Sequence, residues 1–395
     1  MHNKADYLLI LRGLACLAVL IWHIEPPKQY LFYQGINFSW ITFPSGMAAV
    51  WIFFLLSGYF MGKIFFIGKY TLTSTKLRLF YLNRIKRIFP LYYFNVFILS
   101  LVVYPGFWIS NKSVFLNILT FRVNNFWTIM NFNANLWAIS TEVQFYLFVP
   151  VIFLVLRKFL KYSYSSKIIL GILILLSGSA IRYFIAHRYG ITNSTTYSTY
   201  IYTPLFSNID FFIFGFFINL INAELSGIQS RLSNLLQRCR LYMKTITVLL
   251  LTVLYLYSSY SSTFFFQQFD KYSLHILYLL PVMTSLIIGI CIIFFEYEMY
   301  HTLNYKNREK LSLSSIIRNP VRFFEIFGIL SLGIYIWHRP VIDVMHLMNF
   351  DQSRWIPFLQ KLGITFFITM GISIFTYICI EKPFLSHRNK YYKNG

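Results

Sequence analysis

The sequence contains little charge and very few acidic side chains. Charged residues make up 12% of its 395 positions, whereas an average soluble domain has about 25%. Hydrophobic residues account for 57% of the chain, and its mean hydropathy is +0.57. A soluble fold of this length needs far more polar side chains to cover its surface. The composition therefore excludes an ordinary cytosolic enzyme, a disordered protein and a collagen-like fibre.

Cysteine is also scarce, and its pattern carries no metal or disulfide signature. The four cysteines are Cys16, Cys239, Cys291 and Cys379, and no two of them form a CxxC pair. Three of them lie in apolar runs, where cysteine behaves as a small hydrophobic residue. We therefore expect neither a disulfide framework nor a bound metal. The first apolar run lacks a small-residue cleavage site, so we also expect no cleavable signal peptide.

Long apolar runs dominate the chain, and several reach the length of about 17–25 residues that spans a bilayer as a helix. The runs are continuously apolar and do not alternate, which excludes a transmembrane β-barrel. The sequence therefore predicts an all-α fold, a polytopic transmembrane helical bundle that forms one integral membrane domain over 1–395 without an appended soluble domain. We expect about ten spans, at 7–24, 44–62, 88–105, 136–156, 168–186, 206–222, 245–260, 276–297, 323–347 and 358–380.

Basic residues cluster in alternate loops. Lys and Arg total 35 against 13 Asp and Glu, which gives a net charge of +22. No segment outside the spans is large enough to form a nucleic-acid-binding module, so we expect no nucleic-acid partner. The basic loops indicate topology and contact with anionic membrane lipid, and the positive-inside rule places both termini in the cytoplasm. The loops on that side contain Lys4, then Lys63, Lys69, Lys76, Arg78, Arg84, Lys86 and Arg87, then Arg157, Lys158, Lys161 and Lys167, then Arg231, Arg238, Arg240 and Lys244, then Lys306, Arg308, Lys310, Arg318 and Arg322, and finally Lys382, Arg388, Lys390 and Lys393.

The first predicted span contains two ionisable residues, Arg12 and His23. Their spacing puts them within about 20° of one helical face and about 16 Å apart along the helix axis. Ionisable side chains inside a membrane are costly and mark functional sites. We therefore expect Arg12 to face the protein interior near the cytoplasm and His23 to face it near the outer side. The alternative is that Arg12 reaches the cytoplasmic headgroups and His23 simply ends the helix.

Small and basic residues mark the next two spans. Ser57 and Gly58 in the second span allow another helix to approach closely, and the Ser57 hydroxyl is able to form a hydrogen bond across that contact. The following loop ends in Arg84 and Arg87, which share one face if the segment is helical. Two guanidinium groups at a membrane surface suit phosphate groups. The alternative for these two arginines is a purely topological charge, which we prefer for the earlier basic residues of the loop.

The fourth predicted span contains one acidic residue, Glu142. It lies about one to two turns inside the outer end of the span, at a depth similar to that expected for His23. A carboxylate beside an imidazole orients the ring and supports its protonated form. We therefore expect Glu142 to pair with His23. The alternative is a structural ion pair with Arg12 or with an arginine on the outer side.

The ninth predicted span contains His338 and Arg339, with Asp343 close behind them. The i, i+4 spacing of Arg339 and Asp343 predicts a local ion pair. The two longest outward segments, about 106–135 and 187–205, mix aromatic residues with Asn, Ser and Thr. Such a mixture suits sugar binding and equally suits a belt at the lipid headgroups.

Six segments with this kind of chemistry are spread in order along the chain. They are Arg12-x10-His23, Phe53-Phe54-x-x-Ser57-Gly58, Arg84-x-x-Arg87, Trp137 to Tyr146, Tyr335-x-Trp337-His338-x-Pro340 and Glu381-Lys382-Pro383-Phe384. Each segment alone is a weak signal, but together and in this order they resemble the acyltransferase-3 family of integral membrane acyltransferases.

The resemblance implies ten helices in a bacterial inner membrane and an acyl-coenzyme A co-substrate in the cytoplasm, most commonly acetyl-coenzyme A, with no metal. The implied acceptor is a periplasmic or cell-surface glycan, such as lipopolysaccharide or exopolysaccharide, or a lipid-linked glycan. By the same resemblance His23 is the catalytic histidine, and Arg12, Arg84 and Arg87 bind the donor or shape the site. From the residues themselves we expect Glu142 to be catalytic as well, and Ser57 and Gly58 to bind the donor or shape the site. We expect Trp137, Tyr146 and His338 to bind the acceptor or support the structure.

The chemistry of the residues agrees with this function. A sugar hydroxyl is a poor nucleophile and needs a general base, and histidine suits that role at neutral pH. Either the donor thioester reaches His23 directly or an acyl-histidine forms. The rival hypothesis is a glycan or lipid-linked sugar transporter or flippase, which inverted repeats or paired broken helices would mark, and the sequence shows neither. A non-catalytic scaffold would leave Arg12, His23 and Glu142 unexplained.

Overall fold

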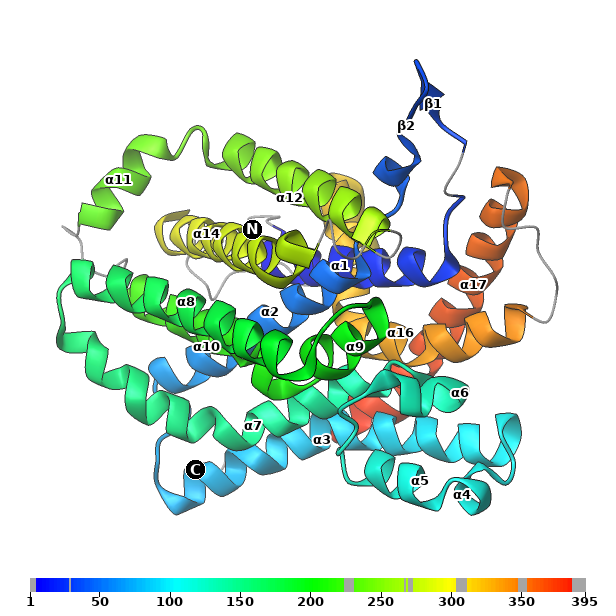
Figure 1. Ribbon diagram of the computed structural model, residues 1–395. Helices are drawn as coiled ribbons and strands as arrows, with labels where there is room; N and C mark the ends of the chain where they lie inside the picture. Colours follow the sequence, from blue (N-terminus) through cyan, green and yellow to red (C-terminus); the bar gives the residue numbers. More distant parts are fainter. Residues whose placement is uncertain are drawn as a thin grey trace.

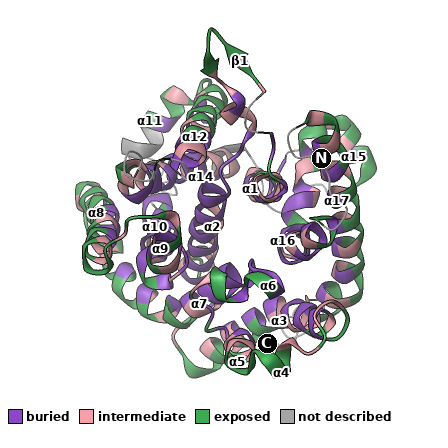
Figure 2. Ribbon diagram, turned by 45° about the vertical axis from the view of Figure 1, so that its right-hand side comes forward, coloured by how far each residue is buried: buried purple, intermediate pink, exposed green. Residues whose placement is uncertain are grey.

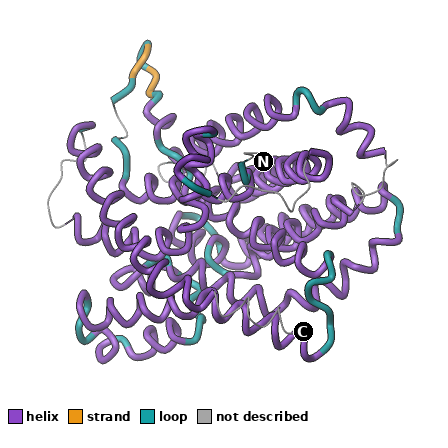
Figure 3. Tube along the Cα trace, turned by 180° about the vertical axis from the view of Figure 1, so that it is seen from behind, coloured by secondary structure: helices purple, strands orange, loops and turns teal. Residues whose placement is uncertain are grey.

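The computed structural model describes residues 5–27, 30–223, 231–265, 268, 273–302, 311–346 and 354–385. Helices make up almost all of this part of the chain (Figure 3), and ten helical segments in it are long and apolar enough to cross a membrane. The prediction of an all-α, ten-span bundle is therefore confirmed. Several of the basic residues used to predict the topology lie outside the described residues, namely Lys4, Lys306, Arg308, Lys310, Arg388, Lys390 and Lys393.

The bundle is built from long helices that are joined by short ones (Figure 1). The long helices are α1 (Tyr7–Ile24), α2 (Gly46–Phe66), α3 (Ser74–Ile98), α7 (Leu136–Leu156), α8 (Tyr164–Tyr189), α10 (Leu205–Asn222), α12 (Met243–Phe265), α14 (Leu280–Thr302), α16 (Phe323–His346) and α17 (Trp355–Thr376). The short ones are α4 (Phe107–Ser110), α5 (Lys112–Leu119), α6 (Met130–Asn133), α9 (Ser194–Tyr197), α11 (Arg231–Cys239) and α15 (Leu313–Arg318). One small hairpin, β1 (Phe32–Tyr33) and β2 (Ile36–Asn37), is antiparallel and stands away from the bundle.

The third span differs most from its predicted position. The sequence places it at 88–105, whereas α3 begins at Ser74 and contains Pro90 in its interior. Neighbouring groups in a membrane protein can satisfy the carbonyl that a proline leaves free, so the helix continues through it. Arg84 and Arg87 therefore lie on a helix, about one turn apart, and not at the end of a loop as predicted.

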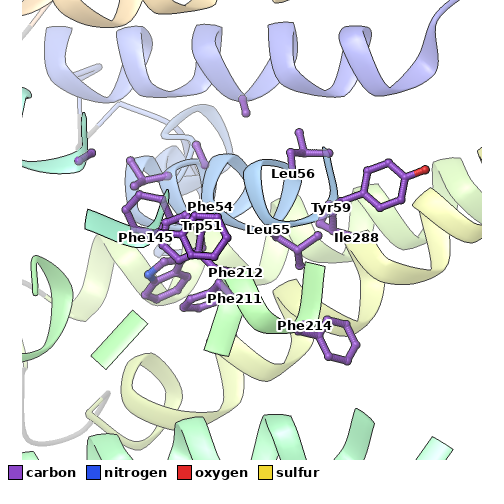
Figure 4. Packing of buried hydrophobic residues seen from close by; sticks show 14 of the residues in the cluster. Trp51, Phe54, Leu55, Leu56, Tyr59, Phe145, Phe211, Phe212, Phe214 and Ile288 are labelled. Atoms are coloured by element: carbon purple, nitrogen blue, oxygen red, sulfur yellow. The ribbon is translucent and has the colours of Figure 1, made fainter. Parts of the chain in front are cut away.

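The centre of the bundle is the contact between α2 and α10. Aromatic rings of the two helices stack there, with the ring centroids of Phe54 and Phe212 4.7 Å apart (Figure 4). The helices approach so closely that a methyl group on Gly58 would overlap the Phe212 carbonyl, and one on Gly215 would overlap the Leu55 carbonyl. Small residues permit this kind of packing inside a membrane.

Helices α1 and α16 form a second close pair. A methyl group on Gly13 of α1 would overlap the Phe324 carbonyl of α16, and one on Gly328 of α16 would overlap the Leu9 carbonyl of α1. These glycine contacts lie in the first half of each helix. Buried apolar residues continue the packing toward the halves that contain His23 and His338, namely Leu20 and Ile24 of α1 and Leu330, Ile334 and Ile342 of α16.

The remaining long helices surround these pairs. The apolar windows of α8 and α17 are only 22% buried inside the protein, whereas that of α10 is 83% buried, and Figure 2 shows exposed residues on the outer faces of α8 and α17. A lipid bilayer suits such apolar outer faces. Phe66 at the end of α2 shares one surface pocket with the basic residues that follow α7, so these two ends lie on the same side of the bundle, as the charge pattern predicts.

Candidate active site

One cavity lies between α1, α2, α3, α7 and α16, and its volume is about 60 Å³. Arg12 enters it from α1, and Arg84 and Arg87 enter it from α3. We call it the arginine cavity. The structure thus brings together Arg12 and the Arg84–Arg87 pair, which lie in two separate segments of the sequence. The other polar residues that line it are Ser57, Glu142, Tyr146, Ser331 and Tyr335.

Glu142 belongs to the arginine cavity. Its Oε1 accepts hydrogen bonds from the hydroxyl groups of Ser57 and Tyr146, each at 2.5 Å. The predicted pair between Glu142 and His23 is therefore wrong, because His23 lines the other cavity. Depth along the membrane suggested the pair, but the rotation of α7 about its axis turns the carboxylate toward α2. In the described part of the chain, no ion pair joins Glu142 to Arg12 either.

Two guanidinium groups of the cavity lie over aromatic rings. Arg84 lies over the ring of Tyr146, with 5.9 Å between its Cζ and the ring centroid, and its Nη1 lies 3.7 Å from the Met61 sulfur. Arg12 lies over the Phe53 ring, also at 5.9 Å. The Arg12 Nε is buried and forms no hydrogen bond within the described residues. Such a donor is costly to leave unsatisfied, so the cavity is suited to an anion that supplies acceptors.

The second cavity is larger, about 410 Å³, and contains His23. We call it the aromatic cavity. It is lined by the opposite halves of α1 and α2 from those at the arginine cavity, and by the two outward segments rich in aromatic and hydroxyl residues. Its aromatic residues are Trp22, Phe43, Phe126, Trp127, Trp137, Tyr202 and Tyr335, and its hydroxyl residues include Ser194, Ser198, Ser262 and Thr263. Burial and the nearby Tyr335 raise the pKa of Tyr202, which lies outside the spans, so its hydroxyl stays neutral.

His23 of α1 contacts His338 of α16 at the edge of this cavity. The Nδ1 of His23 lies 2.9 Å from the Val19 carbonyl oxygen and 3.1 Å from the Nε2 of His338. The Nδ1 of His338 lies 2.9 Å from the Ile334 carbonyl oxygen. The side-chain amide nitrogen of Asn135 lies 3.0 Å from the His338 Nε2. His338 is fully buried, and His23 is partly exposed.

These partners assign the tautomers of both rings. A main-chain carbonyl only accepts, so the hydrogen of His338 sits on Nδ1, and its Nε2 accepts from the Asn135 amide. By the same reasoning the hydrogen of His23 sits on Nδ1, where the Val19 carbonyl accepts it. The Nε2 of His23 is then unprotonated. It is the nitrogen left to act as a base in the aromatic cavity.

The end of α6 and the turn that joins it to α7 hold α16 in place at this site. The side-chain amide of Asn133 donates to the Ile336 carbonyl at 3.0 Å, and that of Asn135 donates to the Tyr335 carbonyl at 3.2 Å. Pro340 lies inside α16, four residues after Ile336, and lacks the N–H that would bond this carbonyl. Asn133 therefore replaces a hydrogen bond that Pro340 removes.

Tyr335 separates the two cavities and lines both. Its ring centroid lies 6.0 Å from that of Phe53 on the arginine side and 5.8 Å from that of His338 on the aromatic side. Among the residues that line these two cavities, Tyr335 is the one that they share.

The remaining predicted site residues lie in different parts of the bundle. Gly58 packs against α10 and lines neither cavity, so it shapes the bundle. Trp137 lines the aromatic cavity, and Tyr146 lines the arginine cavity. Arg339 and Asp343 form the predicted local ion pair, with 3.0 Å between Nε and Oδ1.

Sequence reasoning missed Asn133, Asn135 and Tyr335 as site residues. Two signals for them exist in the sequence. Two amides stand just before a long apolar run, where polar side chains need partners, and Pro340 stands in a span, where it frees a carbonyl.

The comparison with known families decides between the hypotheses. A family model described as an acyltransferase domain matches residues 6–378, which is nearly the whole chain. The chain belongs to the acyltransferase-3 family. Membership in this family supports the acyltransferase hypothesis over the transporter and the scaffold.

Curated relatives of this acyltransferase-3 family member share part of its length. The peptidoglycan O-acetyltransferase OatA of Listeria monocytogenes is 32% identical over 182 residues, which cover 42% of this chain and 26% of the relative. A putative O-acetyltransferase of Staphylococcus aureus is 28% identical over 173 residues, 39% of this chain and 26% of the relative. A putative peptidoglycan O-acetyltransferase of Bacillus subtilis is 25% identical over 181 residues, 42% and 26% of the two chains. The match thus spans about a quarter of the length of these relatives. No solved structure matches the chain.

Proposed function

We propose that the protein is a membrane O-acyltransferase that moves an acyl group, most simply acetyl, from acyl-coenzyme A to a hydroxyl of a glycan. The donor binds at the arginine cavity, and the acceptor binds at the aromatic cavity. Tyr335, which lines both cavities, marks the place where the acyl group passes from one to the other.

The observation that carries the donor assignment is the charge of the arginine cavity. Arg12, Arg84 and Arg87 face it, together with the single carboxylate of Glu142, so it is strongly positive. The unsatisfied Nε of Arg12 supplies a donor that the protein itself does not use. Phosphate oxygens satisfy guanidinium groups in pairs. The phosphate groups of coenzyme A meet this requirement, and a narrow thioester arm suits the restricted space toward Tyr335.

His23 is the base of the proposed reaction. Its unprotonated Nε2 takes the proton of the acceptor hydroxyl while the oxygen attacks the thioester carbonyl; the new ester bond forms, the carbon–sulfur bond breaks and coenzyme A leaves as the thiol. The Val19 carbonyl holds His23 in the required tautomer by accepting from its Nδ1, and the His338 ring lies beside it, with 3.1 Å between His338 Nε2 and His23 Nδ1. In the alternative order of steps, the acyl group is first transferred to His23 and then to the acceptor hydroxyl. Rapid acid quench followed by mass spectrometry of the His23 peptide distinguishes the two.

The lining of the aromatic cavity supports a glycan as acceptor. Aromatic faces beside hydroxyl groups bind the apolar and polar faces of a sugar ring, and a volume of about 410 Å³ falls in the ordinary range of ligand sites. Because similar proteins are named peptidoglycan O-acetyltransferases, peptidoglycan strands are the first acceptor to test, ahead of lipopolysaccharide, exopolysaccharide and lipid-linked glycans.

The decisive assay uses the purified full chain in lipid nanodiscs with radiolabelled acetyl-coenzyme A and each glycan in turn. We expect label on one glycan, and we expect His23→Ala to lower its rate by at least about 100-fold. His187→Ala, at the exposed end of α8, is the matched control and should retain activity. Acyl transfer that survives His23→Ala would refute the assignment of His23 as the base. Glycan transport without acylation would refute the proposed acyltransferase activity.

We further propose that the arginine cavity opens toward the cytoplasm of a bacterium and that the aromatic cavity opens to the outer side of its cytoplasmic membrane. The clustering of basic residues at one end of the bundle supports this orientation. In a cysteine-free variant, an impermeant thiol reagent added to spheroplasts should label Tyr33→Cys in the hairpin and spare Lys69→Cys between α2 and α3. The reverse pattern would invert the orientation.

A further inference from the structure

Helices α8 and α10 share a buried ion pair that lies outside both cavities. Arg182 of α8 and Asp210 of α10 are 2% and 3% exposed. The guanidinium donates to both carboxylate oxygens, from Nη1 to Oδ1 at 3.0 Å and from Nη2 to Oδ2 at 2.8 Å. Neither residue lines the arginine cavity or the aromatic cavity. Ionisable side chains within a membrane span are costly and mark functional positions, so we looked for what this pair holds in place.

A glycine makes room for the pair. A methyl group on Gly178 of α8 would overlap the Asp210 carboxylate. Arg182 lies about one turn further along α8, and its Nη1 also donates to the Ser207 carbonyl at 3.0 Å. A buried ion pair contributes little net stability, because the cost of removing two charges from water offsets their attraction. What its paired bonds supply is a fixed geometry, and here they fix the first turns of α10 against α8.

The same turns of α10 hold the π-helical turn that precedes them, η5 (Ser198–Tyr202). The side-chain amide of Asn208 donates to the main-chain carbonyls of Ile201 and Tyr202 at 2.9 and 2.8 Å. The Ser207 hydroxyl donates to the Ile201 carbonyl at 2.6 Å. These bonds satisfy carbonyls at the end of η5, where no further helical turn supplies donors.

A row of packed rings connects the ion pair with the same turn. The Cζ of Arg182 lies 5.5 Å from the centroid of the Phe211 ring. Phe211 stacks on Trp51, with 5.2 Å between the ring centroids (Figure 4). Trp51 in turn meets the Tyr202 ring edge-on at 6.1 Å, and its indole N–H donates to the Asn208 side chain at 3.1 Å. The ion pair therefore supports η5 through packing as well as through hydrogen bonds.

Both outward segments of the aromatic cavity depend on this support. The two segments are bonded to each other, because the Thr203 hydroxyl donates to the Asn124 carbonyl and the Asn125 amide donates to the Thr199 hydroxyl at 3.2 Å. Four residues that line the cavity come from η5 and from the segment bonded to it, namely Ser198, Tyr202, Phe126 and Trp127. The wall of the aromatic cavity is thus attached to the bundle where Arg182 and Asp210 join α8 to α10.

We propose that Arg182 and Asp210 are positioning residues of the acceptor site. They fix the start of α10, which in turn holds Tyr202 and Ser198 in the wall of the aromatic cavity. This inference rests on the proposed function, because it takes the aromatic cavity as the place where the acceptor binds. The competing explanation is that the pair only stabilises the bundle. Positioning predicts a loss of acceptor binding at constant stability, whereas stabilisation predicts a loss of stability throughout the protein.

Local order is tested first, because it requires no enzymatic activity. The test variant combines Arg182→Met with Asp210→Leu, which replaces the pair by apolar groups of similar shape and should leave the protein folded. In nanodiscs we expect its melting temperature to stay within about 5 °C of wild type. We expect amide hydrogen exchange at 198–204 to become at least about tenfold faster.

Two further variants accompany this test. Arg182→Lys keeps a buried cation beside Asp210 but removes the two-pronged geometry, so exchange at 198–204 should rise by at least about threefold at an unchanged melting temperature. The matched control combines Arg322→Met with Glu325→Leu and removes an equally buried ion pair at the opposite end of α16 from His338. It should leave exchange at 198–204 unchanged. Wild-type exchange there in both Arg182 variants, or exchange that rises uniformly over the chain, would overturn the proposal whether or not the protein transfers acyl groups.

Acceptor use is tested with the same variants and the acceptor that the transfer assay identifies. We expect the combined Arg182 and Asp210 variant to raise acceptor KM by at least about tenfold with an unchanged donor KM, because only the aromatic cavity loses its shape. Arg182→Lys should fall between this variant and wild type. Faster exchange at 198–204 with a wild-type acceptor KM would overturn the positioning role while leaving the proposed function intact. An equal rise of acceptor KM and donor KM would show a general loss of structure and would overturn it as well.

Discussion

The hydrogen bond between Asn133 and the Ile336 carbonyl offers a sharp test of how the site is held. Asn133 is fully buried. Its amide donates to Ile336 and to Asn95 at 3.0 and 3.1 Å, and its oxygen accepts from the Asn135 N–H at 3.2 Å. Hydrogen bonds inside membrane proteins contribute about 0.6–1 kcal/mol each. We therefore expect Asn133→Ala to lower the free energy of unfolding by about 2–3 kcal/mol, the sum of these bonds.

The structure also predicts a partner that rescues part of this loss. Pro340→Ala restores an N–H at position 340, four residues after Ile336, which is the helical donor that the carbonyl lacks. In the Asn133→Ala background this substitution should therefore recover about 1 kcal/mol, whereas in the wild-type background the carbonyl already has a donor and the gain should be smaller.

The measurement is a double-mutant cycle on reversible unfolding in bicelles, with tryptophan fluorescence as the signal that monitors unfolding. The expected result is a coupling free energy of about 1 kcal/mol between positions 133 and 340. Asn111→Ala, whose side chain is exposed and donates to the Ser110 hydroxyl, is the control and should change stability by less than about 0.5 kcal/mol. Strictly additive effects of the two substitutions would refute the account in which Asn133 replaces the bond that Pro340 removes.

Three further predictions concern the cavities. Glu142→Gln removes the one carboxylate that lines the arginine cavity, so donor KM should fall by up to about tenfold with kcat little changed. A loss of kcat at constant KM would instead show that Glu142 acts in the chemical step. Tyr335→Trp should block passage of the acyl group between the cavities and lower kcat by at least about tenfold while donor KM stays constant. Unchanged turnover would show that the acyl group does not pass Tyr335. Changing Arg84 and Arg87 to Ala should raise donor KM by at least about tenfold, because both contribute to phosphate binding. Lys69→Ala, on the loop before α3, should leave donor KM unchanged. Equal donor KM values for the Lys69 variant and the arginine variant would show that these basic residues serve only membrane topology.

The sequence by itself determined the class of protein and the contents of much of the site. Hydropathy is a property of each segment alone, so the length and number of apolar runs predict ten spans without knowledge of their neighbours. Helical phase is equally local. The spacing of Arg12 and His23, and the separation of Arg84 and Arg87, therefore place each pair on one side of its helix before any contact between helices is known.

Only the tertiary structure decided which helix each of these faces meets. Glu142 and His23 have similar depths in their spans, yet they line different cavities, because depth leaves the rotation of each helix undetermined and packing against neighbours sets it. His338 becomes the partner of His23 because glycine contacts between α1 and α16 bring these helices together. Lys361, Thr365, Thr369 and Ser373 recur every four residues in α17, so helical phase places them on one face. Only the packing of the bundle decides that this polar face, and not the apolar one, is buried.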